Sequence, residues 1–309
     1  MGLAVLGMHR SGTSAVTRLL NLMGCSLGPD KSVAAPAHDN TAGFWERLDV
    51  RRTNDRLLAA LGRSWVDCLT IDLDSVVSSE VREFAWSAKK IVGELDSSQP
   101  WVLKDPRFCL TLPAWKPFVD PLITVYVHRD PMASALSLRK RNGIRLPLGL
   151  ALWEHYNLSA LRASSGLPRA NIAYEQLTRD PEAAAERLLQ QLVDQGATAL
   201  HLPDRDALLS FVAPALDHHG AEAAAGSEAP PSESIERLSA ALRDGSAFRG
   251  EVPALSTASA ELLRTASAQW PGQTWITRLL RERDAQVAAL EQQLIEAQRG
   301  RDPSGDGPA

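Results

Sequence analysis

Short apolar runs alternate with amphipathic stretches along the first two thirds of the chain. Leu3–Leu6 is an apolar run that ends at Gly7, and apolar residues recur at helical spacing over 14–23, just before Gly24. This order predicts a strand, a glycine-rich turn and a helix. The same patterns predict further strands at 101–103, 122–127 and 171–174, and further helices at 50–61, 78–95, 132–141, 148–163 and 181–193.

Strands that alternate with helices predict an α/β fold with a central parallel sheet covered by helices on both faces. In such sheets, ligands bind at the carboxyl ends of the strands. Three polar clusters follow predicted strands: GMHRSGTS (7–14), KDPR (104–107) and HRDP (128–131). We therefore expect these clusters to meet at one edge of the sheet and to form the functional site.

The composition changes after residue 219, which we take as the end of a main domain over 1–219. Residues 220–234 are rich in Ala, Gly, Pro and Ser, a composition typical of a linker. A helical appendage is expected over 235–270, with helices near 233–243 and 257–268.

The last part of the chain has a short heptad pattern. Leu280, Val287, Leu290 and Leu294 recur at heptad spacing, which predicts an amphipathic or coiled-coil helix over 271–299. This helix is either a lone amphipathic helix or the seam of a homodimer, and the pattern leaves both open. Residues 300–309 have the composition of a disordered tail.

Charge and cysteine content exclude several classes of protein. The 309-residue chain has a net charge of −4 with both signs mixed, which argues against a nucleic-acid partner. Its three cysteines form no C-x-x-C pair, so we expect reduced thiols, no zinc and no other metal site. There is no basic leader, and no apolar run approaches the ~18 residues of a membrane span. We therefore expect a cytoplasmic protein without a transmembrane segment.

The loop GMHRSGTS has the glycine spacing of the phosphate loop G-x-x-x-x-G-K-[ST], but Thr13 stands in place of the lysine. A glycine such as Gly12 lets backbone N–H groups point inward, and the start of the helix adds partial positive charge. Ser11, Thr13 and Ser14 add hydroxyl donors, and Arg10 adds a guanidinium suited to a phosphate or sulfate. The loop therefore predicts an anion site built without the usual lysine.

Arg-Ser-Gly-Thr-Ser at the start of a helix resembles the 5′-phosphosulfate loop of sulfotransferases that use 3′-phosphoadenosine-5′-phosphosulfate (PAPS). The likeness is greatest to bacterial relatives of the carbohydrate and tyrosyl-protein enzymes. In that family, the 3′-phosphate site is an Arg at a strand end and a Ser eight residues later, here Arg129 and Ser137. Lys104 in LKDPR resembles the Lys-Asp-Pro of the tyrosyl-protein enzymes, and YEQL (174–177) resembles a recurring Tyr-Glu-Asp-Leu. The resemblance covers about residues 3–195 and implies a three-layer, P-loop nucleotide-kinase-like fold with PAPS as donor.

The resemblance also implies roles for single residues. Arg10 and the loop amides would bind the 5′-phosphosulfate, Lys104 would stabilise the leaving oxygen or the sulfuryl oxygens, and no metal would take part. Glu46 in AGFWE lies in a segment comparable to that of the catalytic Glu of the tyrosyl-protein branch, and it is our first candidate for the general base. The rival candidates for the base are Asp105, His38 and His9.

The acceptor is not specified by any motif. We expect a hydroxyl of a carbohydrate, a glycolipid or a small metabolite, bound by the loops 25–46 and 62–75 and by the C-terminal segments. Trp45 is the candidate for stacking on a sugar, whereas Trp65 and Trp153 are expected in the core.

The sequence leaves two other functions to consider. A nucleotide or small-molecule kinase is disfavoured by Thr13, and a non-catalytic nucleotide-binding scaffold by the two phosphate motifs together with Lys104.

Overall fold

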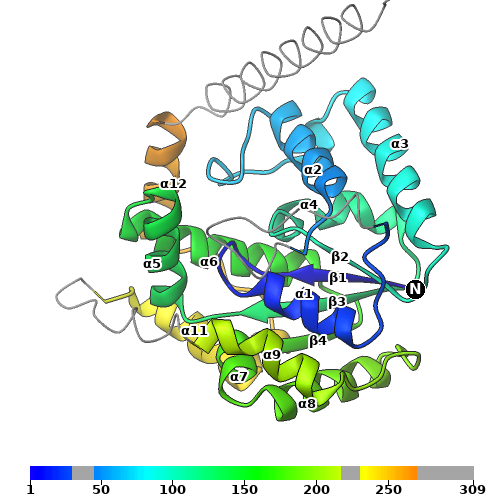
Figure 1. Ribbon diagram of the computed structural model, residues 1–309. Helices are drawn as coiled ribbons and strands as arrows, with labels where there is room; N and C mark the ends of the chain where they lie inside the picture. The colour runs from blue at the N-terminus through cyan, green and yellow to red at the C-terminus, as the bar shows by residue number, and fades with distance from the viewer. Residues whose placement is uncertain (30–44, 217–229, 270–309) are drawn as a thin grey trace, which may run out of the picture.

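The computed structural model describes residues 1–29, 45–216 and 230–269 (Figure 1). Its centre is a four-stranded sheet in the order β2-β1-β3-β4, in which every neighbouring pair is parallel. The strands are β1 (Gly2–Leu6), β2 (Trp101–Lys104), β3 (Leu122–His128) and β4 (Arg169–Ala173). Every residue of β1, β2 and β3 is buried, which explains why these strands appear in the sequence as continuous apolar runs.

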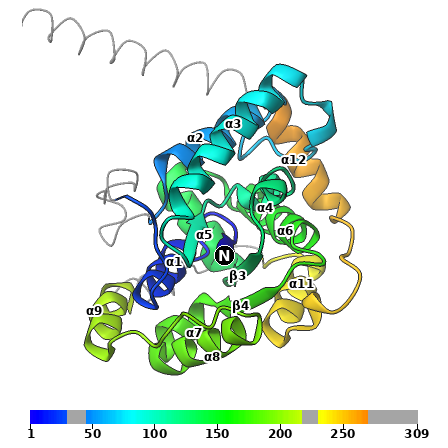
Figure 2. The ribbon, with the colours of Figure 1, turned by 90° about the vertical axis from the view of Figure 1, so that its right-hand side faces the viewer.

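Helices cover both faces of the sheet, and alternate residues of β1 belong to two different cores. Leu3 and Val5 pack into the core with α1 (Thr13–Leu22), and Ala4 and Leu6 pack into the opposite core. One group of helices lies with α1 on one face of the sheet, and a second group lies on the opposite face; in Figure 2, the helices of the first group that follow β4 lie below the sheet. The first group also includes α7 (Tyr174–Arg179), α8 (Pro181–Asp194) and α9 (Arg205–Leu216); the second includes α2 (Leu48–Ala60), α3 (Ser78–Leu95), α4 (Phe108–Trp115), α5 (Pro131–Asn142) and α6 (Leu146–Ala163).

The predicted fold class, a three-layer α/β structure with a parallel sheet, is confirmed. Helix 78–95 coincides with α3, but the strand expected at 171–174 is shifted, since Tyr174 opens α7. Three helices, α4, α7 and α9, have no counterpart among the predicted elements. Helix α4 is apolar on almost every side, because six of its eight residues are buried, so its sequence has no amphipathic period.

Two C-terminal helices complete the core on the α6 side of the sheet. They are α11 (Glu233–Asp244) and α12 (Thr257–Gln269), and both pack against α6. Leu242 of α11 and Leu263 of α12 are buried in the same core as Ala4 and Leu6 of β1. Helix α11 begins inside the segment 220–234 that we expect to be a linker.

The other C-terminal predictions, over 271–299 and 300–309, lie outside the described residues, as does most of the predicted linker. Within the part of the chain that the structure describes, none of the helices is both long enough and apolar enough to cross a membrane.

Candidate active site

Three loops meet at the carboxyl edge of the sheet. In the register of the strands, Val5 of β1 pairs with Lys104 of β2, and Leu6 of β1 pairs with Tyr126 of β3. The chain leaves these strands through GMHRSGTS, KDPR and HRDP respectively, so the three polar clusters lie side by side. The fold therefore brings the predicted site segments together, although the first ends at residue 14 and the last begins at residue 128.

The loop between β1 and α1 is shaped by close packing at its glycines. A Cβ atom at Gly7 would lie 2.6 Å from the carbonyl oxygen of Val127, and one at Gly12 would clash with the ring of Tyr174. Gly12 has a φ of 86°, and Arg10 is also in the left-handed region with a φ of 70°. Helix α1 begins directly after Gly12 and has no side-chain cap, so its first turn faces the loop.

Arg10, Ser137 and Arg129 form one connected group. The Nε atom of Arg10 donates to Oγ of Ser137 at 2.9 Å, and Nη1 of Arg129 donates to the carbonyl oxygen of Arg10 at 3.1 Å. The Arg129 guanidinium lies over the Tyr174 ring, 4.8 Å from its centroid. Since Ser137 accepts from Arg10, its own hydroxyl hydrogen can still be donated. Two guanidinium groups and a hydroxyl from separate motifs thus converge at the start of α1.

The backbone that carries Arg129 is held on two sides. Asp130 is the N-cap of α5, and its side chain accepts from the backbone N–H of Ala133 at 2.9 Å. The backbone N–H of Asp130 donates to Glu175 at 2.9 Å, and the indole of Trp153 donates to the carbonyl oxygen of Arg129 at 3.0 Å. These bonds explain why HRDP forms a sharp corner between β3 and α5.

The polar atoms of the loop suit an anion. Ser11 is 1% exposed, and among the described residues its Oγ has no hydrogen-bond partner. Thr13 is buried and Ser14 is partly exposed at the start of α1. A buried hydroxyl without a partner is costly unless a ligand completes its bonding. Within the described residues, no group of three or more His, Cys, Asp or Glu is placed to hold a metal ion.

Lys104 and Glu46 form a buried ion pair beside this loop. The Nζ atom of Lys104, at the end of β2, donates to Oε2 of Glu46 at 2.7 Å, and the two residues are 3% and 8% exposed. Arg51 on α2 lies 3.8 Å from the other carboxylate oxygen. Trp45, the residue before Glu46, packs elsewhere: its ring lies under the guanidinium of Arg18, 4.4 Å from the ring centroid.

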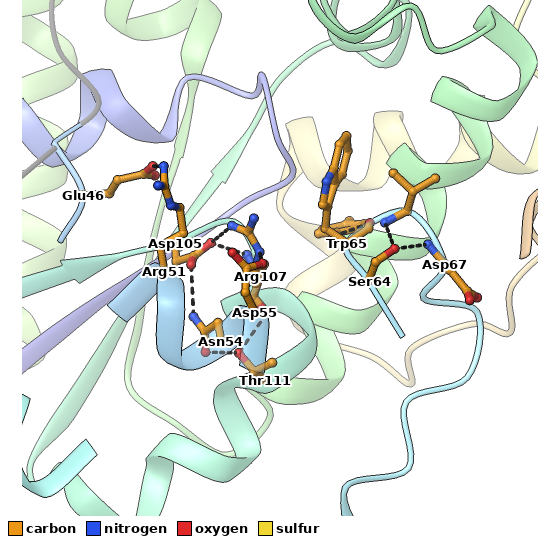
Figure 3. Close-up of polar contacts among 12 residues, drawn as sticks. Glu46, Arg51, Asn54, Asp55, Ser64, Trp65, Asp67, Asp105, Arg107 and Thr111 are labelled. Carbon is orange, nitrogen blue, oxygen red and sulfur yellow. Dashed lines mark hydrogen bonds and ion pairs between the residues drawn. The ribbon is translucent and has the colours of Figure 1, made fainter. Parts of the chain in front are cut away.

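Asp105 is the centre of a buried network that joins the KDPR turn to α2 (Figure 3). Its Oδ1 accepts from the backbone N–H of Arg107 at 2.9 Å and from the Arg107 guanidinium at 3.0 Å, and Oδ2 accepts from Asn54 at 3.2 Å. Burial alone would raise the pKa of Asp105, but Arg107 and Asn54 outweigh it, and the pKa is lowered. With both oxygens engaged by Arg107 and Asn54, Asp105 is poorly placed to accept a substrate proton.

The other candidate bases are in different situations. The His9 ring stacks on Trp65 with centroids 4.5 Å apart. Burial, together with the charges of Arg107 and Lys104, lowers the pKa of His9 well below its ordinary value. His38 lies outside the described residues.

Comparison with known proteins identifies the family of the chain. A model of the sulfotransferase family matches residues 3–193, which is more than half of the chain and includes the three loops. The chain belongs to the sulfotransferase family. No curated protein matches it at the threshold applied.

Three solved structures of sulfotransferases resemble the chain weakly. A sulfotransferase domain from the curacin biosynthetic pathway is 17% identical, covering 86% of this chain and 96% of that chain, with a TM-score of 0.42. A sulfotransferase domain from the Synechococcus PCC 7002 olefin synthase is 16% identical, covering 86% and 94%, with a TM-score of 0.40. A sulfotransferase from Mycobacterium avium is 16% identical, covering 70% and 76%, with a TM-score of 0.34.

Sequence reasoning did not single out several residues that shape the site. Arg107 is written in the KDPR cluster, but its bond to Asp105 and its ion pair with Asp55 at 2.6 Å are visible only in the fold. Tyr174 belongs to the YEQL motif, but the motif by itself does not indicate a role for the aromatic ring. Gly12 is the sequence signal for this contact, because the Tyr174 ring occupies the space that a Cβ at position 12 would need.

Proposed function

We propose that this sulfotransferase moves a sulfuryl group from PAPS to the hydroxyl of a carbohydrate, a glycolipid or a small metabolite. The observation that carries the proposal is the connected group of Arg10, Ser137 and Arg129 at the start of α1. A donor with phosphate groups at two positions needs cations and hydroxyls from two loops. A site for a single inorganic anion would not need both.

The residues present fit PAPS. When bound, PAPS supplies the sulfuryl group, and adenosine 3′,5′-bisphosphate is its leaving group. Arg10, Ser11, Gly12, Thr13 and Ser14 would hold the 5′-phosphosulfate through a guanidinium, hydroxyls and backbone N–H groups. The 3′-phosphate would be held by two further residues, namely Arg129 and Ser137. The buried Oγ of Ser11, without a partner among the described residues, is the atom that most directly calls for such an anion.

Glu46 would accept a proton, and Lys104 would stabilise developing negative charge. A carboxylate such as Glu46 can accept the proton of the attacking hydroxyl. The ammonium group of Lys104 can stabilise negative charge that develops on the departing oxygen, and Arg10 assists from the loop. Because Lys104 and Glu46 lie 2.7 Å apart, both act on the same small region. The mechanism assigns no step to a metal ion.

The working compartment that we propose is the cytoplasm. Cys25, Cys68 and Cys109 are free and buried, which suits a reducing environment.

The absence of a lysine at position 13 separates the chain from kinases, whose phosphate loop uses that lysine on the β- and γ-phosphates.

The decisive experiment is calorimetric titration of adenosine 3′,5′-bisphosphate, and separately of ATP with Mg²⁺, into the full chain. We expect the bisphosphate to bind wild type. Arg129→Ala is expected to weaken it by at least about tenfold, because charge-assisted hydrogen bonds contribute about 1.5–3 kcal/mol each. Ser137→Ala, which removes only a hydroxyl, is expected to weaken binding in the same direction. Arg82→Ala on the exposed face of α3 is the matched control and should bind like wild type.

Folded wild type that binds ATP with Mg²⁺ but not the bisphosphate would instead identify a kinase. Folded wild type that binds neither nucleotide would overturn the proposed donor. Equal affinity in wild type, Arg129→Ala and Ser137→Ala would place the nucleotide elsewhere on the molecule.

A further inference from the structure

The loop around Trp65 lies directly against the phosphate loop. Residues 61–72 connect α2 to the segment before α3, and the Trp65 ring stacks on His9 at 4.5 Å with an interplanar angle of 41°. The ring of Tyr156 also packs on His9, with centroids 5.6 Å apart and near-perpendicular planes. Trp65 is partly exposed rather than enclosed in the core. A large ring therefore flanks the loop expected to hold the sulfuryl end of the donor.

Several hydrogen bonds hold this loop in place. The Tyr156 hydroxyl donates to the carbonyl oxygen of Trp65 at 2.7 Å, and Nε2 of His155 lies 2.7 Å from the carbonyl oxygen of Cys68. The Oγ atom of Ser64 accepts from the backbone N–H of Asp67 at 3.1 Å, which closes a turn within the loop (Figure 3). An aromatic side chain on a loop fixed in this way loses little further conformational entropy when a ligand stacks on it.

The rings that meet at His9 carry no charge. His9 is neutral at pH 7, because its pKa is well below its ordinary value. Lys104 pairs with Glu46 at the end of β2, and the neighbouring strand β1 leads into the loop that carries His9. In Figure 3, Asp105 and Arg107 appear between Glu46 and Trp65. Trp65 thus presents a partly exposed aromatic ring beside the phosphate loop and the Asp105–Arg107 network.

The other tryptophan considered for this role is engaged elsewhere. The Trp45 ring is covered by Arg18 of α1 and packs against the core on the α1 side of the sheet. Trp153 is 1% exposed and donates to the carbonyl oxygen of Arg129. Of these three rings, Trp65 alone is both partly exposed and next to the phosphate loop.

We propose that Trp65 contacts the acceptor and selects acceptors with a flat ring face, whether of a sugar or of an aromatic alcohol, next to the reacting hydroxyl. This inference rests on the proposed function. The apolar face of a sugar ring and the face of an aromatic ring offer the same stacking chemistry to an indole. A linear alcohol of similar size lacks such a face.

The test uses the full chain saturated with adenosine 3′,5′-bisphosphate, with binding followed by saturation-transfer NMR. The probes are phenol, methyl β-glucoside and 1-hexanol, and the variants are Trp65→Ala, Trp65→Phe and the control Trp86→Ala. Trp86 is 65% exposed on α3, where the ammonium group of Lys90 lies 5.5 Å from the centroid of its ring. Phenol and the glucoside are separate arms, so the experiment also shows which kind of ring is preferred.

We expect at least one ring probe to bind loaded wild type, and Trp65→Ala to weaken that probe by about tenfold. Trp65→Phe should recover most of the affinity, Trp86→Ala should match wild type, and 1-hexanol should not distinguish the variants. Equal binding of the ring probe to wild type and Trp65→Ala would overturn the proposal. Equal losses for the ring probe and 1-hexanol, or no ring probe binding to loaded wild type, would overturn it too.

The bisphosphate titration separates this inference from the proposed function. Trp65→Ala is expected to bind the bisphosphate as wild type does. A loss of bisphosphate affinity in Trp65→Ala would make Trp65 a support of the phosphate loop and would overturn its role toward the acceptor. Wild type that fails to bind the bisphosphate overturns the proposed function itself, and the inference with it.

Discussion

Two residues of the phosphate loop have left-handed backbone conformations, and one of them is not glycine. Arg10 has a φ of 70°, a region that costs a residue with a Cβ about 1–2 kcal/mol. Two contacts offset this cost: the bond from its Nε to Ser137 and the bond from Arg129 to its carbonyl oxygen. Strained residues of this kind concentrate at functional sites, where the surrounding structure holds them.

Gly12 offers a test of how closely the loop packs on Tyr174. Gly12→Ala adds a methyl group in the left-handed region and drives it into the Tyr174 ring, which carries the Arg129 guanidinium on its face. We expect the variant to lose about 1–2 kcal/mol of stability from the backbone alone. It should also lose affinity for the bisphosphate, measured by calorimetry, because Tyr174 and Arg129 must move.

Gly166→Ala is the matched control for this prediction. Gly166 has a φ of 71°, but a Cβ there would meet nothing within 4 Å. The control should therefore show the backbone cost without the contact, and its bisphosphate affinity should be unchanged. Equal effects of the two substitutions on affinity would contradict the role of Tyr174.

At the scale of elements, the sequence predicts the buried strands and the amphipathic helices but misses a short helix that is buried on almost every side. The strands of the parallel sheet appear as apolar runs, and α3 as an amphipathic stretch, because burial on two faces or on one face leaves those patterns. Helix α4 is missed since FCLTLPAW is apolar except for Thr111 and contains Pro113, which argues against a helix. The site shows the same contrast. The residues of the two phosphate motifs can be named in advance, but the bond of Asn54 to Asp105 joins positions that no local pattern relates.

Asp105 joins β2, α4 and α2. Replacing it should change both the stability of the protein and the way that stability depends on pH. Because its pKa is lowered in the folded state, Asp105 stabilises the protein above its unfolded pKa of about 3.9. That contribution is lost as the pH falls through the folded pKa. Asp105→Asn should lower the free energy of unfolding at pH 7 by about 3 kcal/mol, because it leaves the buried Arg107 charge with a weaker partner. Its loss of stability on acidification should be smaller than in wild type.

Urea unfolding at pH 7 and at successive values down to pH 3 measures both effects. Asp206→Asn, on the exposed surface of α9, is the control and should follow wild type at each pH. A variant as stable as wild type at pH 7, or one with the same loss on acidification, would show that the network does not depend on the Asp105 charge.

At the scale of the whole molecule, the family match ends at residue 193, but the core and the site depend on helices beyond it. Glu154 on α6 is 2% exposed and accepts from the hydroxyls of Ser256 and Ser259, at the start of α12. The next two residues, His155 and Tyr156, hold the loop that carries Trp65. Near the end of α12, Ser267 donates to Asp67 in that same loop. One turn of α6 and the length of α12 therefore position the loop together.

Replacing both serines at the start of α12 should loosen this arrangement at a distance. The double variant Ser256→Ala, Ser259→Ala leaves the buried Glu154 carboxylate without its hydroxyl donors, and hydrogen bonds to charged groups contribute about 1.5–3 kcal/mol each. Hydrogen exchange followed by mass spectrometry should become faster in 257–269 and, through Ser267 and Asp67, in 62–69. The amides of β1 should keep their protection, and Ser232→Ala, at the exposed start of α11, should change neither region. Faster exchange in α12 with an unchanged 62–69 would show that α6 alone holds the loop, and that α12 contributes to the core without positioning this loop.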